Sequence, residues 1–187
     1  NYNGDDSFSF SVSDGSESSS ASVSLSVSAV NDAPVLATIS DVSFDEDTST
    51  SISVSGSDVD GDDLSYSITG GSDITATLDG SDISFSAPAN YNGSETFTVS
   101  ITDSELSDSQ DIIVTVNAVN DIPIATTGLS GTTNEDQDIV INLSGSDVDG
   151  DALTFSLNTD AANGSISIDG NIATYTPNAN YNGDDSF

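Results

Sequence analysis

Residues 64–85 read LSYSITGGSDITATLDGSDISF, and apolar residues alternate with Ser, Thr and Asp through this stretch. The alternation has a period of two, which is typical of β-strands that bury one face. Gly70-Gly71 and Asp79-Gly80 divide the stretch into three short strands, because such dipeptides favour tight turns. The same alternation runs through the rest of the chain and helical spacing is absent, so we predict an all-β fold.

The stretch belongs to a tandem repeat. Asn31-Asp32-Ala33-Pro34 is followed 89 residues later by Asn120-Asp121-Ile122-Pro123, and Ser55–Asp62 returns as Ser144–Asp151 at the same interval. Similarity at a fixed period indicates an array of equivalent structural units.

The octapeptide NYNGDDSF occupies both residues 1–8 and residues 180–187. It marks the same point in two repeats, just before the sixth strand of each. We therefore expect the chain to be a window of a longer array, with three parts: the last strands of one repeat in 1–30, a complete repeat in 31–119, and a repeat that lacks its last strands in 120–187. The incomplete parts expose strand edges, so self-association through them is also expected.

The complete repeat contains seven apolar segments with strand periodicity. They lie at Val35 to Ile39, Ile52 and Val54, Leu64 to Ile68, Ile74 to Leu78, Ile83 and Phe85, Phe97 to Ile101, and Ile112 to Val116. Seven alternating strands in about 90 residues predict an immunoglobulin-like Greek-key β-sandwich.

All charge in the chain has one sign. It has 32 Asp and Glu residues and no Lys, Arg or His, which gives a formal net charge of −32. Nucleic acid and anionic membranes are poor partners because both require basic side chains, so we expect no nucleic-acid binding. No apolar run is long enough for membrane insertion. Cations are the expected partners. Without Cys the chain has no disulfide or thiolate site, so metal ions are the remaining way to reinforce it.

The composition also argues against an enzyme. No His, Cys, Lys or Arg is present to act as a general base, a cationic stabiliser or the activator of a serine. Paired carboxylates can hydrolyse glycosides and are the one catalytic arrangement left open.

Two acidic clusters surround glycine turns, at Asp58-Val59-Asp60-Gly61-Asp62 and at Asp147-Val148-Asp149-Gly150-Asp151. Alternate residues of an extended segment point the same way, so Asp58 and Asp60 are expected to converge on one hard cation. The spacing is not that of an EF-hand, since the glycine lies at position 4 and Thr69 at position 12. The alternative is a solvated acidic hairpin.

Further acidic and amide residues lie where repeats meet. Asn31-Asp32 and Asn120-Asp121 precede prolines, which fix an extended linker, although an ordinary Asx-Pro turn is the alternative. Glu46 and Glu135 lie just before the second strand, and Asp14 and Asp103 at the turn after the sixth. Each of these four, taken alone, is more typical of surface charge than of a ligand.

The order of these motifs resembles that of cadherin domains. Asp14-Gly15 followed by Asn31-Asp32-Ala33-Pro34 is similar to the end of one cadherin domain, and Glu46 followed by Asp58-Val59-Asp60-Gly61 to the beginning of the next. The chain resembles the bacterial cadherin-like tandem repeats of giant RTX-type surface adhesins. It departs from cadherins in lacking the Leu-Asp-Arg-Glu motif, whose neighbourhood is occupied by the Asn-Tyr-Asn-Gly turn before Phe97.

The resemblance implies calcium (Ca²⁺) between successive domains and assigns its ligands. At the first junction these are Asn31, Asp32, Asp58, Asp60 and Asp103. At the second they are Asn120, Asp121, Asp147 and Asp149, with Glu46 from the preceding domain. Asp14 and Glu135 would belong to junctions beyond the two ends of this chain.

Calcium at the junctions implies a stiff, non-catalytic extender at the cell surface that holds a distal binding domain away from the cell. Two other functions stay open at this stage. A long array of near-identical units is equally suited to self-association into an extracellular filament, sheath or biofilm matrix. A glycan-binding module would need exposed aromatic side chains, and most of those in this chain fall at inward strand positions.

Overall fold

The computed structural model describes residues 2–187; Asn1, the first residue of the predicted segment 1–30, lies outside the described residues. The predicted all-β fold is confirmed, since every regular element in this range is a strand. No helix among the described residues is long and apolar enough to cross a membrane. The chain divides into two compact units, Asn1–Ala118 and Val119–Phe187.

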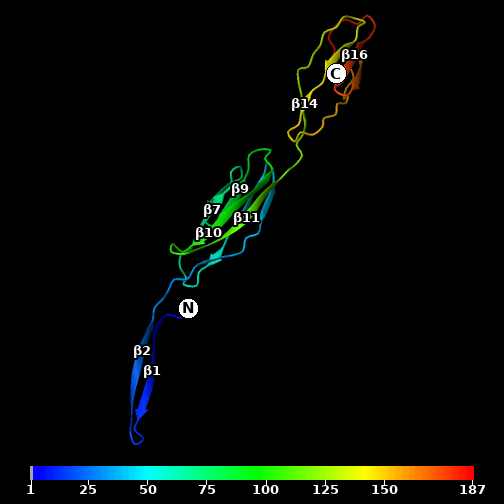
Figure 1. Ribbon diagram of the computed structural model, residues 1–187. Coiled ribbons are helices and arrows are strands. Elements are labelled where there is room, and N and C mark those ends of the chain that lie inside the picture. Colours follow the sequence, from blue (N-terminus) through cyan, green and yellow to red (C-terminus); the bar gives the residue numbers. More distant parts are fainter. Residues whose placement is uncertain (1) are drawn as a thin grey trace. The chain divides into compact units, whose positions relative to one another are not determined.

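The complete repeat folds into a β-sandwich within the first unit (Figure 1). One sheet has the order β4-β11-β10-β7, formed by Val42–Asp45, Ser107–Asn117, Gly93–Thr102 and Ser65–Gly70. The other has the order β5-β9-β8, formed by Ser49–Ser53, Asp82–Ser86 and Thr75–Asp79. A short pair joins β3 (Val35–Leu36) to β6 (Gly56–Ser57).

The core of this sandwich is made by the inward residues that the alternation marked. Phe85 on β9 and Phe97 on β10 are almost fully buried and join the two sheets through an edge-to-face contact, with ring centroids 5.4 Å apart. Val99, Ile101, Ile112 and other inward side chains surround them. Burial of each such side chain stabilises the fold by about 2 kcal/mol, so the period-two pattern accounts for the sandwich.

The first strand differs from the prediction. Only Val35–Leu36 of the expected Val35 to Ile39 segment is a strand, and it pairs with β6. The chain then crosses to the other sheet, where β4 pairs in parallel with β11. The side chain of Gln110 hydrogen-bonds both the amide and the carbonyl of Ile39. A β11 side chain therefore replaces the backbone partners at the crossing and interrupts the strand.

The N-terminal segment forms a hairpin of β1 (Gly4–Ser13) and β2 (Ser18–Val27). Its pairing places Phe8 opposite Val23 and Phe10 opposite Ala21. Its large apolar side chains are mostly exposed; Phe8 is 53% and Phe10 51% exposed. The hairpin thus has strand structure without a core.

The second unit contains two small sheets. One has the order β13-β16-β15, formed by Ile139–Asn142, Ile172–Pro177 and Gly164–Asp169, and the other pairs β12 (Ile124–Ala125) with β14 (Gly145–Ser146). Residues 154–157, which correspond to residues 65–68 of β7, form no strand. β7 pairs with β10 in the complete repeat, and no strand equivalent to β10 exists in this unit to pair with them.

Candidate metal centres

The Asp58–Asp62 segment is a turn organised by one carboxylate. Oδ1 of Asp58 accepts hydrogen bonds from the main-chain amides of Asp60 at 2.8 Å, Gly61 at 3.0 Å and Asp62 at 3.5 Å. Gly61 has φ of 85°, a backbone conformation that favours glycine. The predicted turn at Gly61 is present, but it already begins at Asp58, so Asp58 and Asp60 do not lie on an extended segment.

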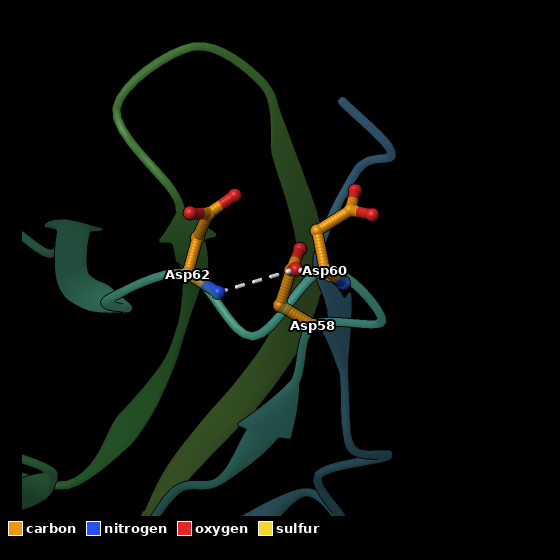
Figure 2. A group of neighbouring side chains, drawn as sticks. All are labelled: Asp58, Asp60 and Asp62. Atoms are coloured by element: carbon orange, nitrogen blue, oxygen red, sulfur yellow. Dashed lines mark hydrogen bonds between the residues drawn. The ribbon is translucent and has the colours of Figure 1, made fainter. Parts of the chain in front are cut away.

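The turn gathers three carboxylates. Asp58, Asp60 and Asp62 each offer an oxygen that lies within 4.8 Å of the others, and their side chains project from the same loop (Figure 2). A hard cation such as Ca²⁺ takes six to eight oxygen ligands at ~2.3–2.6 Å. The donor set contains only oxygen atoms, so its chemistry fits calcium better than a soft transition metal.

The second oxygen of Asp58 strengthens this fit. While Oδ1 is occupied by backbone amides, Oδ2 is buried and has no hydrogen-bond partner among the described residues. A buried carboxylate oxygen without a partner costs free energy. Coordination of a cation would remove that cost, because the turn leaves this oxygen available.

The linker approaches the same turn. The amide of Asp32 donates a 2.8 Å hydrogen bond to Oδ2 of Asp60, and the Asn31 side chain donates a 2.9 Å hydrogen bond to Oδ2 of Asp103. The structure therefore joins the linker to two loops of the sandwich. All five residues assigned to the first junction lie at one pole of the domain.

Asp103 is prepared to remain charged at this pole. Its side chain is only 8% exposed, and Oδ1 accepts hydrogen bonds from the amides of Leu106 and Glu105, both at 2.7 Å. The hydrogen bond from the Leu106 amide has the largest effect on the pKa of Asp103 and that from the Asn31 side chain the next largest. Together they hold this pKa below its usual range. Asp14 has the equivalent position in the hairpin, where the amides of Glu17 and Ser16 lower its pKa.

The opposite pole of the sandwich contains Glu46. Glu46 is 3% exposed, and its main-chain amide donates a 2.9 Å hydrogen bond to the carbonyl of Asn117 at the end of β11. Glu46 therefore lies beside the exit of the chain from the domain, where the cadherin resemblance places a ligand. Glu135, its counterpart in the second unit, is exposed, because no strand equivalent to β11 covers it.

The second unit repeats the arrangement of the first pole. Oδ1 of Asp147 accepts from the amides of Asp149 at 3.0 Å and Asp151 at 3.1 Å. Oδ2 of Asp149 accepts from the amide of Asp121 at 2.7 Å, and Asn120 donates to the carbonyl of Asp121 at 2.8 Å. The four residues assigned to the second junction from this unit are thus brought together within it.

Sequence reasoning missed Asp62 as a member of the site. An extended segment directs attention to alternate residues, and Asp62 joins the cluster only because the turn at Gly61 returns the chain toward Asp58. The sequence signal was the glycine between two aspartates, repeated as Gly150 before Asp151. Gly150 has φ of 80°, so Asp151 is the equivalent of Asp62 in the second unit.

Another strongly perturbed carboxylate stabilises a loop. Glu95 accepts hydrogen bonds from the Ser72 hydroxyl at 2.6 Å and from the amides of Ser72, Asp73 and Ile74. The Ser72 hydroxyl, with support from these amides, lowers the pKa of Glu95 to about 2. Because the chain has no basic side chains, backbone and hydroxyl donors take their place as partners for carboxylates.

Both repeats match a known protein family. The family model of the bacterial Ig domain matches the chain twice, over residues 31–115 and 120–187. The chain belongs to the bacterial Ig domain family. The resemblance to bacterial Ig-like and cadherin-like tandem repeats is therefore confirmed, and the family is generally non-catalytic. A comparison with curated proteins gave no match.

Several solved structures are similar to this bacterial Ig chain. They include an endo-fucoidan hydrolase of glycoside hydrolase family 107, with 18% identity over 95% of this chain and 30% of the other and a TM-score of 0.38. Domains 1–6 of the surface layer protein SbsC have 17% identity over 94% and 25%, with a TM-score of 0.37. The titin domains Z1Z2 in complex with telethonin have 13% identity over 82% and 85%, with a TM-score of 0.36.

The chain spans 30% of the length of the fucoidan hydrolase.

Proposed function

We propose that this pair of bacterial Ig repeats is a calcium-stiffened extender segment of an extracellular surface protein. Calcium ions bind at the poles of the repeats and fix the linkers, so that the array holds a distal binding domain away from the cell. The role is that of the cadherin-like repeats of surface adhesins, which the sequence resembles.

The observation that supports this most directly is the contact between Asp32 and Asp60. One residue of the acidic turn hydrogen-bonds the linker that leads into the domain, and the same contact recurs between Asp121 and Asp149. A cation held by the turn would therefore be in direct contact with the segment that must be stiffened.

Electrostatics gives the reason for metal dependence. A chain with a formal charge of −32 and no basic residue repels itself, and a divalent cation between carboxylates reverses that repulsion locally. Extracellular modules bind calcium at ~10⁻⁴ to 10⁻³ M. The array would be stiff outside the cell, where calcium is millimolar, and flexible inside.

The test is calcium-dependent melting and small-angle X-ray scattering of the chain, with EDTA or magnesium for comparison. Calcium at about 100 times its dissociation constant, about 10 mM for a site of about 10⁻⁴ M, stabilises a binding domain by about 2.7 kcal/mol. We expect a melting temperature at least about 5 °C higher than in EDTA and a longer, stiffer particle.

Asp58→Asn with Asp60→Asn should remove most of this response at the first pole. The matched control is Asp79→Asn with Asp169→Asn, which makes the same change of charge at two Asp-Gly turns where asparagine is equally favourable. Melting and scattering that ignore calcium would overturn the proposal, as would equal loss of the response in both variants.

A further inference from the structure

The four Asn-Gly pairs of the chain have a common neighbour. They are Asn3-Gly4, Asn92-Gly93, Asn163-Gly164 and Asn182-Gly183. A Cβ atom placed on each glycine would have a tyrosine as its nearest neighbour outside the adjacent residues; in the same order these are Tyr2, Tyr91, Tyr175 and Tyr181. At Gly93 and Gly183 the tyrosine oxygen would lie 2.9 Å from that Cβ, so the tyrosine fills the space that a side chain would take.

The Asp-Gly pairs show that this contact is selective. The chain has five of them, and a Cβ on their glycines would meet nothing within 4 Å. These glycines are Gly15, Gly61, Gly80, Gly150 and Gly170. None of the eleven glycines that follow a residue other than asparagine, all of them within the described residues, has a tyrosine among its nearest atoms. The tyrosines therefore mark the places where asparagine precedes glycine, and not turns in general.

Two equivalent positions of the repeats differ together. Counted from the Asp-Gly turns at 79–80 and 169–170, Asn163-Gly164 takes the place of Asp73-Ile74, and Tyr175 takes the place of Phe85. Tyrosine is thus present in the repeat that has the Asn-Gly pair, and phenylalanine in the repeat that lacks it. A Cβ on Gly164 would overlap the Tyr175 ring.

Tyrosine hydroxyls also hold the backbone beside these glycines. Tyr2 and Tyr181 each donate a 2.7 Å hydrogen bond to the carbonyl of the residue that follows the glycine. Tyr175 donates at 3.3 Å to the carbonyl of Asn163, which belongs to the Asn-Gly peptide bond itself. Rotation of ψ at the asparagine would turn this carbonyl away from its donor.

Asn-Gly pairs are chemically labile, because asparagine is a thermolabile residue and glycine has neither a Cβ nor a restricted backbone to hinder the reaction. The main-chain nitrogen of glycine attacks Cγ of asparagine and gives up its proton to solvent, and the side-chain nitrogen leaves as ammonia. Water then opens the cyclic imide. Opening at Cγ gives aspartate, and opening at the main-chain carbonyl gives isoaspartate.

We propose that the four tyrosines protect the Asn-Gly pairs from deamidation. Each covers the side of the glycine on which a Cβ would lie, and the hydroxyl bonds oppose the rotation that brings the glycine nitrogen to the asparagine side chain. This role is independent of calcium binding. It lengthens the working life of a protein whose loss is set by irreversible chemistry.

Damage at these pairs would fall on the sheets. Gly93 is the first residue of β10, where it lies opposite Val116, and Gly164 is the first residue of β15, where it lies opposite Pro177. Isoaspartate adds a carbon atom to the main chain directly before such a strand. Aspartate adds a further negative charge to a chain that has no basic residue.

The test is incubation of the whole chain at mildly alkaline pH in EDTA, with deamidation at each pair followed by peptide mass spectrometry. Tyr91→Leu should accelerate deamidation of Asn92 about tenfold and leave the other three pairs at their wild-type rates. Tyr66→Leu is the matched control. Tyr66 is also partly buried and packs against the same core, but it covers no glycine, so Asn92 should keep its wild-type rate.

A second variant tests the hydroxyl separately from the ring. Tyr175→Phe keeps the ring over Gly164 and removes the hydroxyl bonds to Asn163 and Asp185. Deamidation of Asn163 should become about threefold faster, as expected for the loss of a modest hydrogen bond, and Tyr175→Leu should accelerate it further. An unchanged rate in Tyr175→Phe would contradict the role given to the hydroxyl.

Equal deamidation of Asn92 in the wild type and in Tyr91→Leu would overturn the proposal. So would an equal acceleration in Tyr66→Leu, since loss of domain stability would then explain both. Urea supplies the reference for an unprotected chain, in which all four pairs of the wild type should react at least about tenfold faster than in the folded chain. Equal rates with and without urea would show that the fold gives no protection.

Discussion

The amide of Asp32 donates a hydrogen bond to Oδ2 of Asp60, and 89 residues later the amide of Asp121 makes the same bond to Asp149. The two distances, 2.8 and 2.7 Å, are those of charge-assisted hydrogen bonds. Each linker is therefore attached to the acidic turn of the domain that follows it. Exchange of this amide should therefore depend on the carboxylate of Asp60 in the first unit and of Asp149 in the second.

The first prediction separates this hydrogen bond from metal binding. Asp60→Ala removes the acceptor, so amide hydrogen exchange at Asp32 should become about tenfold faster in EDTA, as expected for a hydrogen bond worth about 1.5 kcal/mol. Asp60→Asn keeps an oxygen acceptor and should leave exchange in EDTA within about threefold of wild type. It should nevertheless lose most of the calcium response. Equal exchange in the two variants would show that the bond does not hold the linker.

A second prediction concerns the charge of the whole chain. In EDTA, raising NaCl from about 0.02 to 0.5 M should raise the melting temperature of the sandwich, because salt screens repulsion among 32 carboxyl groups that have no cationic partner. Saturating calcium should reduce this salt dependence at least twofold, because bound ions have already neutralised the poles. Melting curves at several salt concentrations measure both effects. A melting temperature that falls with salt would contradict this explanation.

The sequence predicted the sandwich well because its core depends on local alternation. Phe97, Val99 and Ile101 are the inward residues of β10, as their spacing indicates. The crossing of the first strand was missed because it depends on Gln110, a side chain 71 residues away from Ile39. Val42 and Phe44 alternate like any strand, but a local pattern cannot reveal the sheet in which they pair.

The acidic site was predicted only in part, because a local sequence pattern does not describe the path of the backbone through a turn. The composition and the repeated spacing identified Asp58 and Asp60 as partners. The place of Asp62 follows from the backbone at Gly61, which a period-two argument does not describe. Glu95 gave no sequence signal, since its partners are the Ser72 hydroxyl and main-chain amides of a loop more than twenty residues away.

A third prediction uses the pKa of Glu95, about 2 in the folded state against an ordinary value of 4.5. A depressed pKa stabilises the fold above the unfolded value, and this increment is lost as pH falls from about 4.5 to about 2. Glu95→Gln should cost about 1 kcal/mol at pH 7, with allowance for solvent exposure, and little at pH 2. Urea unfolding across this range gives the difference curve. The exposed Glu105→Gln variant is the control and should run parallel to wild type.

A fourth prediction compares two glycines with positive φ. A Cβ at Gly80 (φ 62°) meets nothing within 4 Å, so Gly80→Ala should cost about 1 kcal/mol of unfolding free energy from backbone strain alone. At Gly71 (φ 75°) the Cβ would lie 2.5 Å from both the Ile74 carbonyl oxygen and the Phe97 ring. Gly71→Ala should therefore cost about 3 kcal/mol, because overpacking adds to the strain. Urea denaturation measures both, and equal losses would show that the Phe97 ring yields freely.

The last prediction tests the crossing between the two sheets. Gln110 donates to the carbonyl of Ile39 and accepts from its amide, and the amide of Leu36 donates to Oδ2 of Asp108 at 2.9 Å. Gln110→Ala leaves two partly buried backbone groups without protein partners and should lower the unfolding free energy by about 2 kcal/mol. Gln110→Glu keeps an acceptor but loses the donor, so it should be intermediate at pH 7 and approach wild type when the carboxyl group is protonated.

The effect should be local as well as global. Hydrogen exchange in Gln110→Ala should accelerate at Ile39 and along β4 more than in β8, which belongs to the other sheet. Uniform acceleration through the sandwich would mean that β4 unfolds only with the whole domain. In that case Gln110 contributes to stability without deciding where the first strand changes sheets.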